Sequence, residues 1–123
     1  PDDVGRSAAE RALKRLNPRK VPSQSAPVIY DPRVSMSIVG HFSSAIHGMS
    51  VARGTSFLKD KMGSQVFAKG VTIVDDPHRA RGLRSKPFDG EGVANRKMNL
   101  LEDGVLKHWL LDCAAALQLG LSS

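Results

Sequence analysis

Cysteine and long apolar runs are nearly missing from this sequence. Cys113 is the only cysteine among 123 residues, so no disulfide can form within the chain. A reducing compartment such as the cytoplasm suits a chain of this kind. No apolar run approaches the roughly 20 residues that span a bilayer, and no segment has the pattern of a signal peptide. We therefore predict a cytoplasmic protein without a membrane segment.

Aromatic and acidic residues are also scarce. Aromatic residues make up 5% of the chain, and 12 acidic residues face 18 lysines and arginines, which gives a net charge of +6. Such a surplus can draw a protein toward nucleic acid. The aromatic residues, however, do not alternate with the basic ones as stacking platforms do. A solvated face and a basic loop therefore explain the charge better. The basic residues gather in two stretches, Arg11, Lys14, Arg15, Arg19 and Lys20 and then Arg79, Arg81, Arg84 and Lys86.

The sequence lacks a recognisable catalytic centre. It contains no Gly-x-Ser-x-Gly elbow for a serine nucleophile. His41 and His47 are six residues apart with no glutamate between them, which turns their side chains about 120° apart on a helix. His78 and His108 are isolated, and the apolar neighbours of Cys113 favour a buried, inert thiol. We therefore predict no catalytic residue and no metal site in this chain.

Two short polar segments beside glycines are the candidates for contact with a ligand. Arg53, Thr55 and Ser56 follow a predicted helix and offer a cation and two hydroxyls to a peptide carboxylate or carbonyl. Asp89 and Glu91 lie in a long loop and could position a ligand with their carboxylates. Each segment also has a simpler structural explanation. The first is a helix stop with a left-handed glycine, and the second is a turn that glycine makes possible.

Apolar spacing predicts helices over 2–16, 32–52 and 114–119. The longest has one continuous apolar stripe and mostly small residues on its other side, so we predict that it is buried. Its stripe consists of Val34, Ile38, Phe42, Ile46 and Met49.

Short apolar or β-branched runs and one turn signal predict strands. Residues 71–74 form the clearest one, 27–30 could form a buried one, and 97–102 with 105–111 form a hairpin around Asp103-Gly104. The predicted fold class is α+β, with a short mixed sheet, a C-terminal β-hairpin, one long buried helix and two shorter helices. With only about four strands, at least one sheet edge should be unpaired unless another chain or a further part of this one covers it.

Several longer stretches, taken in order, resemble the PmbA/TldE branch of the TldD/PmbA family. They are residues 15–20, 31–33, 53–58, 70–77, 87–92 and 102–106. Members of this family are much longer chains. The resemblance implies that residues 1–26 are the end of a middle region with its linker and that 27–123 are the first part of the C-terminal domain. The absence of a methionine before Pro1 agrees with an interior piece.

The resemblance also implies a function. TldD-type members bind zinc on a His-Glu-x-x-x-His helix and pair with a TldE/PmbA subunit to degrade unstructured peptides. The matching helix here departs from that pattern at His41 and His47. The resemblance thus implies a non-catalytic subunit that binds unfolded peptide beside a TldD-type partner, with zinc in the partner and none in this chain. Self-association through exposed sheet edges is a further expectation.

Two alternatives remain open at this stage. The family has been linked by name to DNA gyrase, so the first is a basic DNA- or gyrase-associated binding module. The second is a hydrolase whose site is assembled at an oligomer interface. The candidate residues for a peptide-facing wall are Arg53, Thr55, Ser56, Asp89 and Glu91.

Overall fold

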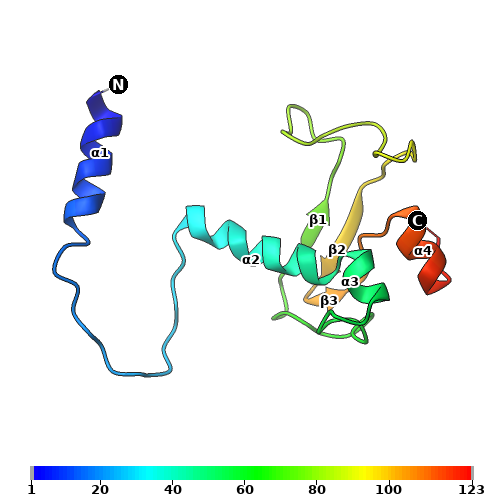
Figure 1. Cartoon of the computed structure of the whole chain (residues 1–123), viewed down its shortest axis with the longest axis horizontal. Helices are drawn as coiled ribbons and strands as arrows, with labels where there is room; N and C mark the ends of the chain where they lie inside the picture. The colour runs from blue at the N-terminus through cyan, green and yellow to red at the C-terminus, as the bar shows by residue number, and fades with distance from the viewer. Residues whose placement is uncertain (1, 123) are drawn as a thin grey trace.

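Helices and one small sheet make up the computed structural model of the chain, which describes residues 2–122 (Figure 1). The predicted α+β class is confirmed. Within these residues no helix combines the length and the apolar character needed to cross a bilayer. The elements are α1 (Asp2–Leu13), α2 (Pro32–Ala45), α3 (Gly48–Ala52), β1 (Ile73–Asp75), β2 (Met98–Glu102), β3 (Val105–Leu106) and α4 (Cys113–Leu119).

The sheet has the order β1-β2-β3, and both pairings are antiparallel. The predicted hairpin turn is confirmed, because Asp103 and Gly104 have φ angles of 47° and 78°, as a two-residue turn requires. The prediction of a mixed sheet is wrong, and a parallel pairing occurs only as an isolated bridge of His47 with Leu110 among the residues described. The second hairpin strand, predicted over 105–111, ends at Leu106, and Leu110 pairs with His47 instead of within the sheet.

The core lies between the C-terminal end of α2 and the sheet. Ile46, Leu101 and Leu106 are completely buried. The ring of Phe42 meets the ring of Phe67 edge to face, with centroids 5.5 Å apart. The core therefore depends on the last turn of α2 and on the hairpin rather than on the whole helix.

The single helix predicted over 32–52 is wrong, because the chain breaks it at residues 46–47. The Leu110 N–H donates to the Ile46 carbonyl (3.0 Å), and the Gly48 N–H donates to the Leu110 carbonyl (2.7 Å). These two bonds pull His47 into an extended conformation, and α3 then starts in a new direction. A Cβ at Gly48 would lie 2.7 Å from the Cβ of Ala115, so glycine allows α3 to pack closely on α4.

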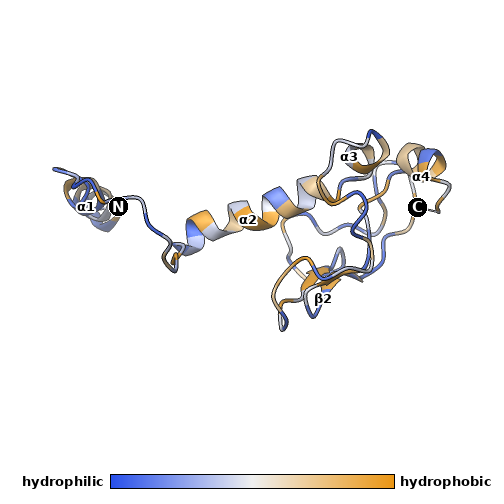
Figure 2. Cartoon of the chain, turned by 90° about the horizontal axis from the view of Figure 1, so that it is seen from below, coloured by the Kyte–Doolittle hydropathy of each residue, from blue (hydrophilic) through white to orange (hydrophobic). Residues whose placement is uncertain are grey.

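Two further predictions about burial are wrong. The long helix is buried only near its end, since most of residues 32–41 are exposed and α2 extends away from the body (Figures 1 and 2). Residues 27–30 form no strand, and Ile29 is 97% exposed. The predicted first helix is shorter, ending at Leu13, and has no buried residue. Apolar spacing indicated the helices but not which part of each one meets a partner.

An ion pair joins the residue that follows β1 to the residue that precedes β2. Asp76 Oδ2 lies 3.2 Å from Lys97 Nζ, and this hydrogen-bonded contact, with smaller help from the His78 backbone, lowers the pKa of Asp76. Because the pKa is lowered in the folded state, the stabilisation is present above the unfolded pKa of about 4 and is lost as the pH falls through the folded value.

We expect a Lys97→Met variant to bring the pKa of Asp76 back toward its ordinary value, because the ammonium is the main cause of the shift. An NMR titration of the Asp76 carboxyl measures this directly. Lys107→Met is the control, since Lys107 pairs with Glu102 instead. An Asp76 pKa that stays low in Lys97→Met would contradict the assignment.

Candidate functional site

An open cleft of about 700 Å³ forms where the end of β1, the long loop after it and the segment following β3 meet. The segment 107–112 supplies one wall and residues 93–96 supply another. The lining residues are His47, Met62, Asp75, Pro77, Asp89, residues 93–96, Met98, residues 107–112, Leu121 and Ser122. The cleft thus draws on parts of the chain that are far apart in sequence.

Charged residues of both signs and apolar residues line the cleft together. Asp75 and Asp89 bring carboxylates, and Arg96 brings a guanidinium. Trp109 and Leu110 belong to the same lining, and Trp109 is mostly buried in the core. Carboxylates accept and guanidinium groups donate hydrogen bonds, so such a lining can bond to both the N–H and the C=O groups of an extended peptide.

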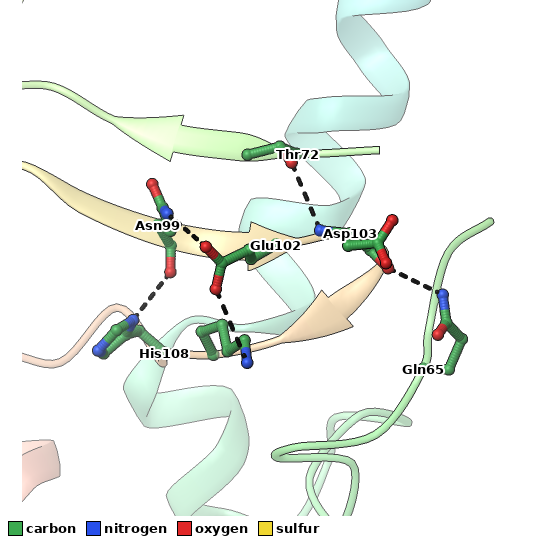
Figure 3. A network of polar contacts seen from close by, with 7 residues as sticks. Gln65, Thr72, Asn99, Glu102, Asp103 and His108 are labelled. Carbon is green, nitrogen blue, oxygen red and sulfur yellow. Dashed lines mark hydrogen bonds and ion pairs between the residues drawn. The ribbon is translucent and has the colours of Figure 1, made fainter. Parts of the chain in front are cut away.

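His108 contributes a nitrogen with a defined role. Its Nδ1 lies 2.8 Å from the carbonyl oxygen of Asn99, as Figure 3 shows. Because a carbonyl oxygen only accepts hydrogen bonds, Nδ1 is the donor, which leaves Nε2 as an acceptor in the neutral ring. The sequence had marked His108 only as an isolated histidine, and its partner on the neighbouring strand was the missing information.

Of the predicted site residues, Asp89 alone belongs to the cleft lining. Its Oδ1 accepts hydrogen bonds from the backbone N–H groups of Glu91 and Val93, both at 2.9 Å. Its own N–H donates to the Val93 carbonyl, also at 2.9 Å. One carboxylate oxygen therefore closes the turn over 89–93, which fixes Asp89 in place at the edge of the cleft.

Glu91 is used inside the fold. Its Oε2 accepts a hydrogen bond at 2.9 Å from the backbone N–H of Cys113, the first residue of α4. The predicted burial of Cys113 is wrong, because this residue is exposed. Asp112 caps the same helix, and its Oδ1 accepts from the Ala115 N–H at 2.7 Å. Two carboxylates thus lie at the positive end of one helix, which is a favourable place for negative charge. Glu91 fastens the long loop to α4.

We expect Glu91→Ala to lower the free energy of unfolding by about 0.5–1 kcal/mol, as loss of a helix cap does. Urea unfolding of the two proteins measures the difference. Glu10→Ala is the matched control, since Glu10 lies on the exposed α1, and it should change stability much less. Equal effects of the two substitutions would show that Glu91 does not hold α4.

Arg53, Thr55 and Ser56 lie at the C-terminal end of α3, apart from the cleft lining. Gly54 has the left-handed φ of 69° expected of a helix stop, and Arg53 and Thr55 are exposed. Ser56 is buried: its hydroxyl donates to the Ala45 carbonyl (2.6 Å) and accepts from the Leu58 N–H (3.0 Å). Ser56 therefore holds the end of α2 and does not fit the predicted contact with a peptide.

Within residues 2–122, the two histidines of the candidate zinc motif lie on different elements. His41 lies on α2, whereas His47 comes after that helix has ended at Ala45. Across residues 2–122, no three histidine, cysteine or carboxylate side chains gather as metal ligands. The two histidines thus lack the continuous helix that a His-Glu-x-x-x-His motif would need.

Comparison with known proteins gives consistent matches. Residues 23–123 match the family model of the PmbA/TldA metallopeptidase C-terminal domain. The metalloprotease PmbA of Escherichia coli O157:H7 is 43% identical over 123 residues, which cover all of this chain and 27% of that protein. The chain therefore spans about a quarter of the length of this relative.

Solved structures agree with the sequence matches. A proposed modulator of DNA gyrase from Bacteroides thetaiotaomicron superposes with a TM-score of 0.91 at 29% identity, over 96% of this chain and 27% of that one. TldE from Thermococcus kodakarensis superposes with a TM-score of 0.62 at 33% identity, over 70% of this chain and 20% of that one.

Proposed function

Since this chain belongs to the PmbA/TldA metallopeptidase family, we propose that it is part of a TldE-like, non-catalytic subunit that degrades flexible peptides together with a TldD-type partner. In this proposal the partner carries the zinc, and the present chain contributes part of the wall along which the peptide lies. The similarity to TldE supports the choice of subunit.

The observation that carries this proposal is the end of α2 at Ala45. A zinc helix of the TldD type needs both histidines on one unbroken helix, and here the two belong to different elements. The break is fixed by the backbone bonds of Ile46 and Gly48 to Leu110, so it is part of the fold of the body. A subunit built in this way depends on another for its metal chemistry.

The cleft supports the peptide-binding part of the proposal. Asp89 and Arg96 offer an acceptor and a donor, and His108 offers its Nε2 for a further hydrogen bond. Groups of this kind bind the repeating N–H and C=O of a main chain without selecting side chains. Arg53 and Thr55 are exposed at the end of α3, and we propose them as contacts for a more distant part of the same peptide.

The full-length protein, with and without a TldD-type partner, provides the test. Bound zinc and cleavage of an unstructured peptide are measured on each sample. We expect cleavage only from the mixture and zinc only on the partner. Zinc and cleavage from the full-length protein alone would overturn the non-catalytic assignment.

A second measurement tests whether Asp89 and Arg53 contact the peptide. In the active mixture, Asp89→Asn and Arg53→Gln should each raise KM about tenfold, equivalent to about 1.4 kcal/mol, with little change in kcat. The amide introduced by Asp89→Asn keeps a side-chain oxygen for the turn over 89–93, so the fold should persist. Lys61→Gln, at an exposed position outside the cleft lining, is the control. Unchanged KM in both site variants would remove these residues from the wall.

A further inference from the structure

The sheet has one covered edge and one open edge. Beyond β3, the segment 63–67 lies against the sheet: Gln65 forms a bridge with Val105, and the Leu106 N–H donates to the Ser64 carbonyl (3.0 Å). Beyond β1, no strand within residues 2–122 pairs with the sheet. An unpaired edge leaves a row of backbone donors and acceptors available to another strand.

The apolar stripe of α2 continues past this open edge. Phe42 and Ile46 lie on the stripe and are buried, at 4% and 0% exposure, whereas Ile38 and Val34 are 38% and 53% exposed one and two turns before Phe42. Positions four apart share a helix face, so Ile38 continues the face of Phe42. Figure 1 shows this half of α2 extending past β1, on the side where the sheet is open. The core therefore ends halfway along its helix.

Helix α1 has no packing partner among the residues that the structure describes, yet the chain as a whole superposes on a longer protein. Within residues 2–122, α1 contacts no other helix or strand. Even so, the chain superposes on the Bacteroides protein with a TM-score of 0.91 over 96% of its residues, which make up 27% of that protein. In that longer protein, the other residues can therefore hold this arrangement in place.

We propose that the full-length protein adds at least one β-strand to the outer edge of β1, and that this strand lays apolar side chains on Val34 and Ile38 of α2. The strand belongs to the same polypeptide rather than to a second copy. β1 has three residues, which is a short edge for pairing from solution. Pairing within one chain needs far less binding energy, because no translational freedom is lost. This inference concerns the fold of the subunit and does not depend on the proposed function.

Two cysteine substitutions in the full-length protein test the cover over α2. Ile38 and Met36 are two residues apart on the same helix, so their side chains point about 160° apart, and Met36 is 74% exposed. Ile38→Cys and Met36→Cys are labelled with a maleimide under native conditions, with the unsubstituted protein giving the background from Cys113 and any other cysteine. We expect Met36→Cys to react at least about tenfold faster than Ile38→Cys, as opening by about 1.4 kcal/mol would require. Equal rates would overturn the proposal.

Two further readouts identify what covers the helix. Slow labelling of Ile38→Cys that becomes fast on dilution would point to a second copy and overturn the choice of occupant. Hydrogen exchange of the unsubstituted protein examines the strand itself: backbone amides of 73–75 directed away from β2 should be protected. Fast exchange there, with Ile38→Cys still slow to label, would mean that something other than a strand covers α2, which also overturns the proposal.

Discussion

Replacing Gly104 with alanine should lower the free energy of unfolding by about 2–4 kcal/mol. Gly104 has a φ of 78°, a conformation that disfavours side chains. An added Cβ would also lie 2.6 Å from the Ala68 carbonyl oxygen and closer still to Gln65 Nε2 and the Phe67 carbonyl oxygen. Two of these neighbours are backbone atoms, so the surroundings cannot simply rotate away.

The hydrogen bonds of Gly104 also prevent its own backbone from shifting to avoid the clash. Its N–H donates to the Val71 carbonyl (2.8 Å), and its carbonyl accepts from the N–H groups of Val66 (2.9 Å) and Phe67 (3.1 Å). Both sides of the residue are thus fixed to the segment 66–71. Relief of the clash would break at least one of these bonds.

Urea unfolding measures the effect, and Gly90→Ala is the matched control. Gly90 also follows an aspartate, but a Cβ there meets nothing within 4 Å and its φ is not positive. We expect that change to stay within about 0.5 kcal/mol, as for ordinary surface substitutions. Similar losses at Gly90 and Gly104 would show that the close approach at Gly104 is not what constrains it.

Ser56→Ala should lower the free energy of unfolding by about 1–3 kcal/mol. The hydroxyl is buried, and it joins the Ala45 carbonyl to the Leu58 N–H. Alanine would leave a carbonyl at the end of α2 and a backbone N–H without this partner. Since buried unsatisfied groups lose their hydration as well as their bond, the penalty exceeds the value of an exposed hydrogen bond.

Thr55→Ala is the control for Ser56→Ala. The Thr55 hydroxyl is exposed and donates to the Ser50 carbonyl (3.2 Å), which also accepts backbone N–H groups from Thr55 and Ser56. We expect its removal to change stability by less than about 0.5 kcal/mol. A stable Ser56→Ala protein whose complex no longer cleaves peptide would instead favour the prediction of a peptide contact at Ser56.

Local signals predicted the parts of the fold that are decided locally. The helix predicted over 114–119 is observed as α4, capped by Asp112 at its start and by Gly120, with a φ of 66°, at its end. The Asp103-Gly104 turn is set by two neighbouring residues. The break in the long helix was not predictable in this way, because Leu110, about sixty positions further along, decides the conformation of residues 46–48. Nothing in the helical spacing signals such a partner.

The candidate site was predictable only in fragments. Polar residues beside glycines drew attention to Asp89 and Glu91, but the contact of Glu91 with Cys113 joins residues 22 positions apart. Ser56 and Thr55 are adjacent and chemically alike, yet one is buried and the other exposed. The cleft itself combines the ends of several elements, so its composition follows from the fold and not from any motif.

The contacts around Asp103 and Gly104 also have a consequence for the order of folding. The turn is local, but its partners are distant: Asp103 Oδ1 accepts from the Gly70 N–H (2.6 Å), and Gln65 donates to the Asp103 carbonyl (3.1 Å), across 33 and 38 positions. Closing loops of this length carries an entropic penalty that a two-residue turn does not. The hairpin can therefore form early, with the segment 65–72 docking on it late. Substitutions at this junction should then accelerate unfolding more than they slow folding, so the junction governs how long the folded state lasts.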